Sequence, residues 1–151
     1  MNHEIRDVNK SDASELLFIA DIDSKIPLDY DPHYLWDESR VKTRLEYYGR
    51  LAPESFFEVV ELDRKVIAFH ILDKTPDESC GKVGNIVTLW VDPAYRERGF
   101  AQILKTRAEA WATAKGFVAI QTTVHKSNTK MMSFNQKLGY LETYVSMKKL
   151  I

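Results

Sequence analysis

The amino-acid sequence predicts a mixed α/β fold, of the α+β kind, with a single central mixed sheet. Three observations support this prediction: alternating apolar runs within residues 55–72, a strongly apolar run "NIVTLWV" at 85–91, and a helix-periodic run that begins soon after it. Strands and helices that follow one another in this way bury one shared core. No linker or change of composition interrupts the chain, so a single domain over residues 1–151 is expected.

The first elements are indicated by periodicity and capping residues. "EIRDV" at residues 4–8 alternates like a short strand. In "SDASELLFIA", Asp12 and Glu15 have the spacing of a capping box at the start of a helix. The following stretch, at 23–39, is rich in Asp, Pro and aromatic residues, which indicates a loop or a broken helix.

A second helix and three strands are expected next. Apolar residues at helical spacing mark one face of a helix near residues 41–48. The runs at 55–62 and 65–72 are typical of strands, and the polar pair at 63–64 fits a tight hairpin turn between them. A polar loop then leads to the apolar strand at 85–91.

The second half of the chain is predicted to contain a helix, a strand, a short helix and a last strand. Apolar residues recur at helical spacing after residue 99, and Gly116 suits a left-handed C-terminal cap. "VAIQTTV" at 118–124 predicts a strand, residues 128–138 predict a helix, and "YLETYVSMKKL" at 140–150 predicts the last strand. The predicted order is therefore βααβββαβαβ.

Composition and charge argue against several classes of protein. The net charge of −1 gives no electrostatic reason to expect a nucleic-acid partner. The single cysteine, Cys80, cannot form an internal disulfide, and no set of metal ligands is evident. The N-terminal stretch is polar and no apolar run approaches the length of a membrane span, so a cytoplasmic protein without a membrane partner is expected.

The run "TLWVDPAYRERGFAQIL" carries the clearest chemical signal. An apolar strand ends, a turn follows, and a helix starts beside Arg96, Arg98 and Gly99. A glycine lets the backbone approach a bound group, and the first turn of a helix presents unpaired N–H groups with partial positive charge. These features suit an anion such as a phosphate. An ordinary strand-to-helix turn with solvated arginines is the alternative interpretation.

The sequence resembles the GNAT superfamily of N-acetyltransferases, which share an acyl-CoA N-acyltransferase fold. Residues 96–101 match the family's cofactor motif, Gln/Arg-x-x-Gly-x-Gly/Ala. The strand before this motif and the run at 128–140 also have the family's usual form. The opening "IRDVNKSDASEL" is similar to the family's first strand and helix, so the resemblance covers essentially the whole chain.

The resemblance implies that the protein binds acetyl-CoA as its acyl donor. Backbone N–H groups of the turn would hold the pyrophosphate, and the strand before it would pair with the pantetheine arm. Asn128 would bond the pantetheine, and Asn135, about two helical turns further on, lies on nearly the same helix face. The predicted cofactor-binding residues are Leu89, Trp90, Val91, Arg96, Glu97, Arg98, Gly99, Phe100, Ala101, Asn128 and Asn135.

The catalytic positions depart from the family's pattern. Asn135 stands where many members have a tyrosine credited with protonating the departing thiolate, and an amide has no such proton to give. Asn85 and Thr123 stand where relatives carry a basic Glu or His, and either could orient a water that accepts the amine proton. Asn135 could instead only cap or solvate its helix. The catalytic residues are therefore unknown, and the candidates are Asn135, His70 and Asn85.

Histidines and one polar loop offer further candidates. His70 and His125 titrate in the range that a base needs, although a strand histidine such as His70 is more often a hydrogen-bonded core residue. The loop around His33 could hold a cationic amine through carboxylates and aromatic faces, or could simply connect two helices at the surface. The other residues considered in this loop are Asp29, Asp31, Tyr34, Trp36 and Asp37.

These inferences predict an N-acetyltransferase that moves an acetyl group from acetyl-CoA to a primary amine by direct attack in a ternary complex. A small cationic amine is slightly favoured as the acceptor. Two alternatives stay open: a non-catalytic acyl-CoA-binding sensor, and an enzyme that acts on a protein N-terminus or lysine. The last predicted strand also allows a homodimer, in which that strand would pair with a second chain.

Overall fold

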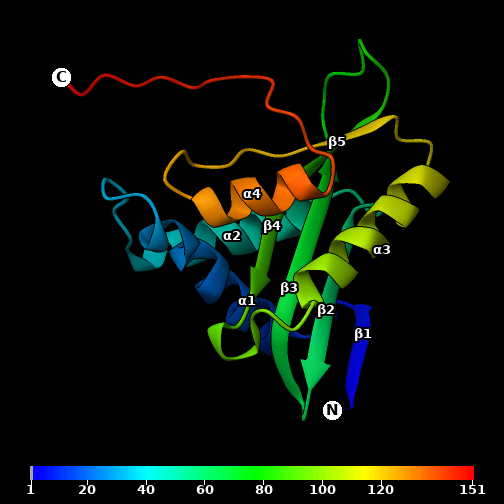
Figure 1. Ribbon diagram of the computed structural model, residues 1–151. Helices are drawn as coiled ribbons and strands as arrows, with labels where there is room; N and C mark the ends of the chain where they lie inside the picture. Colours follow the sequence, from blue (N-terminus) through cyan, green and yellow to red (C-terminus); the bar gives the residue numbers. More distant parts are fainter. Residues whose placement is uncertain (1) are drawn as a thin grey trace.

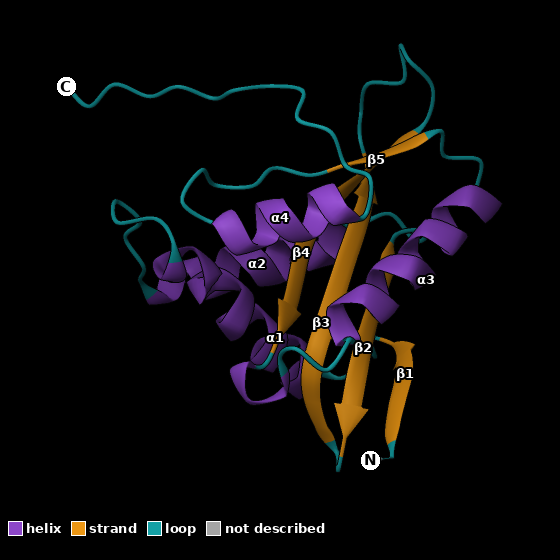
Figure 2. Ribbon diagram, in the orientation of Figure 1, coloured by secondary structure: helices purple, strands orange, loops and turns teal. Residues whose placement is uncertain are grey.

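The predicted single mixed sheet is confirmed and has five strands (Figures 1 and 2). The computed structural model describes residues 2–151. The strands lie in the order β1-β2-β3-β4-β5, and all neighbours are antiparallel except β4 and β5, which run parallel. Their bounds are β1 His3–Asp7, β2 Phe56–Leu62, β3 Lys65–Lys74, β4 Val83–Val91 and β5 Ala119–Gln121.

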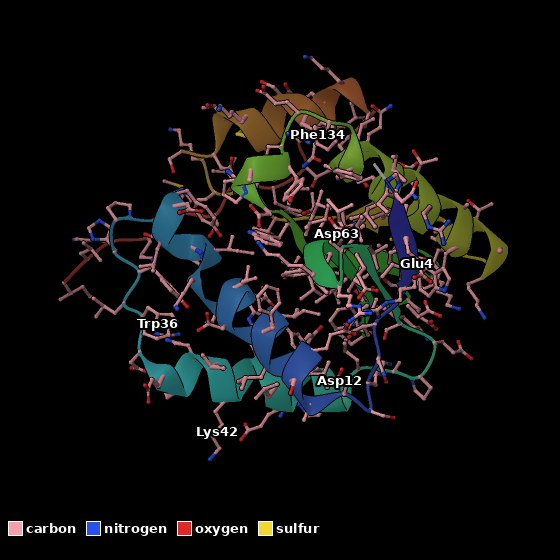
Figure 3. All side chains as sticks on the ribbon, turned by 90° about the horizontal axis from the view of Figure 1, so that it is seen from below. Glu4, Asp12, Trp36, Lys42, Asp63 and Phe134 are labelled. Carbon is pink, nitrogen blue, oxygen red and sulfur yellow. The ribbon has the colours of Figure 1, made fainter. Side chains whose placement is uncertain are left out.

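Helices cover both faces of the sheet. The helices α1 and α2 pack against each other on one face, and α3 and α4 lie on the other. Figure 3 shows the same division from below, with Trp36 and Lys42 on the side of α2 and Phe134 on the side of α3. The helices are α1 Ala13–Lys25, α2 Glu38–Arg50, α3 Phe100–Ala114 and α4 Thr129–Lys137, with 3₁₀ turns η1 Ile26–Asp29 and η2 Pro93–Tyr95.

The sheet separates two cores because successive side chains of a strand point to opposite faces. Val59 of β2 packs in one cluster with Ile19 of α1 and Tyr48 of α2. Its neighbour Val60 packs in another cluster with Leu104 of α3. Burial on both faces explains why β2 and β3 are nearly continuous apolar runs in the sequence.

Two local sequence signals, the cap at Asp12 and the hairpin turn at 63–64, are confirmed. Asp12 caps α1 by accepting hydrogen bonds from the backbone N–H groups of Ser14 and Glu15, over 3.0 and 3.2 Å. The Glu15 carboxylate does not complete the capping box, because it accepts from the Asn9 backbone N–H over 2.7 Å instead. In the hairpin turn, Asp63 and Arg64 have φ of 49° and 65°, the left-handed pair that a two-residue hairpin favours.

The strand predicted at 118–124 forms only in part, and this difference opens the sheet. Ala119–Gln121 pairs with the start of β4, in the register Val83↔Ala119 to Asn85↔Gln121. Beyond this point β4 continues, whereas residues 122–125 leave the sheet. The two segments therefore diverge, and a cavity lies between them.

The last strand predicted at 140–150 is wrong, because residues 140–151 belong to no strand. The segment runs away from the body of the protein (Figure 1). From residue 141 onward its apolar side chains are exposed, as Tyr144 at 95% and Met147 at 91% show. Alternation of apolar and polar residues predicts that a segment can occupy a half-buried strand. A strand also needs a neighbouring strand edge for its hydrogen bonds, and residues 140–151 pair with no edge of this sheet. Among residues 2–151, no helix is both long and apolar enough to cross a membrane.

Candidate functional site

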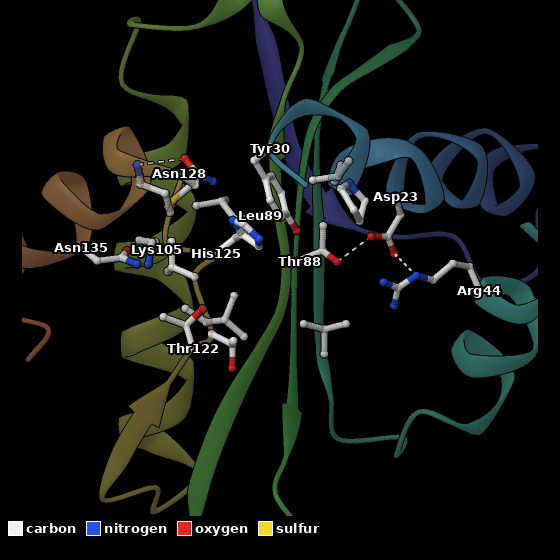
Figure 4. A pocket seen from close by; sticks show the side chains of 17 residues that line it. Asp23, Tyr30, Arg44, Thr88, Leu89, Lys105, Thr122, His125, Asn128 and Asn135 are labelled. Carbon is white, nitrogen blue, oxygen red and sulfur yellow. Dashed lines mark hydrogen bonds and ion pairs between the residues drawn. The ribbon is translucent and has the colours of Figure 1, made fainter. Parts of the chain in front are cut away.

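The candidate site is the cavity where β4 and the chain after β5 diverge (Figure 4). Its volume is about 120 Å³. Residues 86–89 of β4 form one wall and residues 122–125 form the other. Helices close the two ends: α3 and α4 contribute Lys105, Asn128, Met131 and Asn135, and the α1–α2 side contributes Asp23, Ile26, Pro27, Tyr30 and Arg44.

The open edge of β4 presents backbone N–H groups to this gap. The N–H of Asp92, directly after β4, donates to the carbonyl of Ile67 in β3 over 2.8 Å. Because N–H groups alternate in direction along a strand, those of Leu89 and Val91 point away from β3, toward the gap. β5 pairs only with residues 83–85, so it does not occupy this part of the edge. The edge can therefore pair with an extended ligand, as an added strand would.

The turn between β4 and α3 has the geometry of an anion site. Arg96 Nε donates to the Val91 carbonyl over 3.0 Å and ties the turn to the strand. Glu97 and Gly99 both have left-handed backbones, with φ of 62° and 87°. Such residues within a turn direct successive N–H groups into one concavity that favours an anion. Gly99 is also the N-cap of α3, and no side chain caps the first N–H groups of that helix.

Side chains around the turn support its backbone. Asp92 accepts from the Ala94 N–H over 2.9 Å and pairs with Lys65 over 3.0 Å, and the Ala94 N–H holds the pKa of this carboxyl below its ordinary value. The Phe100 side chain is buried and packs edge-on against His3, at 5.1 Å between ring centroids. Trp90 stacks on Phe69 at 5.3 Å. Phe100 and the partly buried Trp90 therefore anchor the turn against the core.

Asn128 and Asn135, which the sequence places on one helix face, both line the cavity. Asn128 is the N-cap of α4, and its Oδ1 accepts from the Met131 N–H over 3.3 Å. Asn135 is the buried residue of α4, at 5% exposure, and its Oδ1 has no hydrogen-bond partner within residues 2–151. A buried acceptor without a donor is costly. This oxygen is therefore an acceptor available to a ligand N–H or a water in the cavity.

Sequence reasoning missed Lys105, whose side chain is 3% exposed and lines the cavity beside Asn135 (Figure 4). Its Nζ lies 4.4 Å from the ring centroid of Tyr140 and 5.8 Å from that of Phe134. Burial lowers the pKa of this ammonium group to about 8, although Glu109 partly opposes the shift. The spacing of residues in α3 could have revealed this burial, because Lys105 shares a helix face with the small apolar residues Ala101, Ala108 and Ala112.

A second group that the sequence did not reveal is the buried carboxylate of Asp23, at 1% exposure. It accepts from the Tyr48 hydroxyl over 2.6 Å and from the Thr88 hydroxyl over 2.7 Å. Arg44 Nε lies 3.5 Å from it. Burial and the adjacent carboxylate raise the pKa of Tyr48 far above its ordinary value. Asp23, Arg44 and the nearby Tyr30 thus give the α1–α2 end of the cavity its polar character.

The other candidate catalytic residues occupy different environments. His70 is 1% exposed, its Nδ1 lies 2.9 Å from the Thr88 carbonyl, and burial lowers its pKa to about 4. It does not line the cavity, and neither does Asn85, which pairs with Gln121 where the sheet is still closed. Thr123 and His125 do line it.

Of the loop around His33, which the sequence suggested as the acceptor side, only Tyr30 lines the cavity. Tyr30 was not among the candidates named from the sequence. Its ring lies 5.3 Å from that of His125. Tyr34 and Trp36 instead bond to Ser24 at the end of α1, over 2.6 and 2.9 Å. His33 is exposed. Most of this loop therefore packs against α1 or faces solvent.

Comparisons with known proteins identify the family and the shared fold. The acetyltransferase (GNAT) family matches residues 16–140. A search of curated proteins finds no match. Among solved structures, AAC(6')-Iy in complex with the bisubstrate analogue CoA-S-monomethyl-acetylneamine is 21% identical, with a TM-score of 0.70 over 100% of this chain and 99% of that chain.

Two further solved structures show how widely the fold is shared. An aminoglycoside acetyltransferase, HMB0005, from an uncultured soil metagenomic sample is 14% identical, with a TM-score of 0.74 over 100% of this chain and 99% of that chain. A transcriptional regulator from Bacillus halodurans C-125 is 16% identical, with a TM-score of 0.77 over 99% of this chain and 100% of that chain. At these identities the likeness shows the fold alone.

The fold and the family match together indicate an acyltransferase. The family match covers most of the chain, and the protein belongs to the GNAT acetyltransferase family.

Proposed function

We propose that the protein transfers an acetyl group from acetyl-CoA to a primary amine, by direct attack within a ternary complex. One observation supports this most strongly: the turn before α3, whose left-handed residues suit an anion, directly follows β4, and the unpartnered Asn135 Oδ1 lines the cavity beside that strand. An elongated ligand with a pyrophosphate at one end and amide groups along its arm fits both features.

The donor would bind on the α3–α4 side. Backbone N–H groups of residues 96–101 would hold the pyrophosphate, because the turn and the start of α3 concentrate unpaired donors there. The pantetheine arm would pair with the N–H groups of Leu89 and Val91. Its amides would also reach Asn135, and Asn128 has an amide N–H₂ left to donate after capping α4.

The acceptor would approach from the α1–α2 side. Asp23 contributes a carboxylate to this end of the cavity, and Tyr30 and His125 contribute aromatic faces. The aromatic faces favour a cationic group, which supports a small cationic amine, whereas the buried Asp23 carboxylate is already paired with Arg44 at the same end of the cavity. Two of the similar structures are described as aminoglycoside acetyltransferases, and aminoglycosides are cationic amines. This likeness adds support to a cationic amine as the acceptor.

The reaction would need little covalent help from the protein. A neutral amine attacks a thioester readily once the two are held together, so positioning supplies much of the rate. A backbone N–H of β4 near Val91, at the open edge, would stabilise the negative charge that develops on the carbonyl oxygen. Thr123 and His125 would orient water that removes the amine proton. A cytoplasmic site of action and a single domain over residues 1–151 remain part of this proposal.

The test is an assay of CoA release with acetyl-CoA and a panel of small polyamines, aminoglycosides and peptides. We expect turnover with at least one small cationic amine, and none above background in the Gly99→Glu variant. Turnover with peptides alone would favour a protein acetyltransferase. CoA binding without turnover on any acceptor would contradict the enzyme and favour a sensor.

A further inference from the structure

Lys105 holds a buried ammonium group at the cavity that acyl transfer, as described so far, does not use. Within residues 2–151 its Nζ contacts two aromatic rings, those of Phe134 and Tyr140, and makes no hydrogen bond or ion pair. A lysine normally keeps its ammonium in water. A lysine that is 3% exposed beside a cavity is therefore placed where a ligand can become its partner.

The position of Lys105 places it on the side of the cavity where the acyl donor would bind, rather than on the side where the amine acceptor would enter. Lys105 comes from α3, and Asn135 beside it comes from α4, so both lie on the face of the sheet where CoA would bind. Asp23 and Arg44 lie at the opposite end, beyond β4 (Figure 4). A group on the α3–α4 side can reach the sulfur of a thioester in the gap, whereas the attacking amine would enter from the other side.

We propose that Lys105 is the catalytic acid that protonates the sulfur of CoA as it leaves. This inference rests on the proposed acyl transfer, and it supplies the proton that Asn135 cannot give. The amine nitrogen forms a bond to the carbonyl carbon, and the bond from that carbon to sulfur breaks with its electron pair on sulfur. One proton of the Lys105 ammonium moves to the sulfur, and the product is neutral CoA thiol. The new amide nitrogen loses its extra proton to water, and the neutral Lys105 regains a proton from water.

The charged groups around Lys105 set its acidity. Burial lowers its pKa to about 8, and Glu109 on α3 acts in the opposite direction. The Tyr140 phenol has a pKa raised to about 12, mainly by burial, so it is a poorer acid, and it does not line the cavity. His70, on the face of the sheet that α3 covers, is neutral near pH 7. An ordinary thiol has a pKa of about 8.5, close to that of Lys105, which suits transfer of a proton between them. The remaining charged or titratable groups along the cavity are Asp23, Tyr30, Arg44 and His125.

The direct test needs no turnover. CoA bound to the protein is titrated while the ultraviolet absorbance of its thiolate is followed. Burial alone would raise the pKa of the bound thiol above that of free CoA. An adjacent ammonium group would lower it, and we expect ionisation about one pH unit below that of free CoA. A bound thiol in the wild-type protein that ionises at or above the pH of free CoA would overturn the inference.

Variants assign the effect to Lys105. Lys105→Met keeps the volume and removes the charge, so it should reverse the shift and raise the pKa of the bound thiol. Lys137→Met, on the exposed face of α4, is the matched control and should behave as wild type. Calorimetry of CoA binding confirms that each variant is folded. Equal thiol pKa in wild type and Lys105→Met would also overturn the inference.

Turnover separates this inference from the proposed function. Lys105→Met should lower kcat about 100-fold with CoA affinity unchanged. Lys105→Arg keeps a positive charge that does not release its proton near neutrality, so it should also be slow. It should also lack the fall in kcat that we expect for the wild type above about pH 8. An active Lys105→Met variant would refute the role of Lys105 alone. A wild-type protein that lowers the thiol pKa but acetylates no amine would refute the proposed function and leave the placement of Lys105 intact.

Discussion

The Thr88 hydroxyl donates a hydrogen bond to Asp23 Oδ1 over 2.7 Å, and this contact joins β4 to α1 beside the cavity. Asp23 also accepts from the Tyr48 hydroxyl of α2 over 2.6 Å. A buried carboxylate needs such partners, since desolvation without them is costly. The network therefore fixes both helices against the sheet on the side where the acceptor is proposed to enter.

Removing one donor from this network should destabilise the protein. Thr88→Val keeps the shape of the side chain but leaves Asp23 with one fewer donor, and we expect a loss of about 1.5–3 kcal/mol in the free energy of unfolding. Urea denaturation at pH 7 measures it. Thr106→Val, on the exposed face of α3, is the control. Equal stability of the two variants would show that the Asp23 network contributes little.

The buried His70 predicts a loss of stability in acid. Burial lowers its pKa from 6.5 to about 4 in the folded state, so the unfolded chain binds a proton first as the pH falls. The stabilisation that neutral His70 contributes is present in full above pH 6.5 and is lost progressively as the pH falls. By pH 4 this loss amounts to about 3 kcal/mol in the free energy of unfolding. Unfolding by urea at a series of pH values measures this loss.

His70→Gln is the control for that measurement, because glutamine does not titrate. The difference in stability between pH 7 and pH 4 should be smaller in the variant than in the wild type by the same amount. Parallel curves for the two proteins would mean that His70 titrates normally in the folded state.

Asn135 is expected to assist binding more than chemistry. Asn135→Ala removes one acceptor from the cavity, so CoA affinity should fall about fivefold, which corresponds to about 1 kcal/mol. Steady-state kinetics at saturating acetyl-CoA should show kcat within about tenfold of wild type. A loss approaching a thousandfold, or about 4 kcal/mol, would show a direct catalytic role for Asn135 and would weaken the case for Lys105.

The C-terminal segment should contribute little to the stability of a single chain. Deleting residues 141–151 removes no strand and no buried side chain, so the free energy of unfolding should change by no more than about 0.5 kcal/mol. Light scattering of both proteins accompanies the denaturation. A larger loss, together with a change in mass, would mean that the segment pairs with a second chain as its alternation predicts.

Short-range patterns in the sequence predict most of the fold. Helical spacing, the Asp12 cap and the hairpin at Asp63 and Arg64 each depend on a few neighbouring residues, and each is confirmed. The partial strand after Val118 and the missing last strand depend on a partner edge elsewhere in the chain. That information is not contained in the alternation of either segment.

The same distinction applies to the site. The turn around Gly99 is contiguous, so the motif alone marks it as a candidate anion site, whereas the left-handed backbones of Glu97 and Gly99 are a finding of the structure. Lys105 and Asp23 were missed because their burial depends on how α3 and α1 pack, and a charged residue on a helix is usually solvated. The assignment of CoA contacts to single residues stays a prediction.

Calorimetric titration of CoA into wild type and Gly99→Glu tests the central claim most directly. At φ 87° the glutamate strains the turn, and its carboxylate would lie where the pyrophosphate is proposed to bind. Gly49→Glu makes the same change on the exposed surface of α2, where no atom lies within 4 Å of an added Cβ. We predict that Gly49→Glu binds CoA like the wild type and that Gly99→Glu loses at least about 100-fold in affinity, or about 2.7 kcal/mol. Equal CoA affinity in all three proteins would contradict the assignment of this turn as the pyrophosphate site.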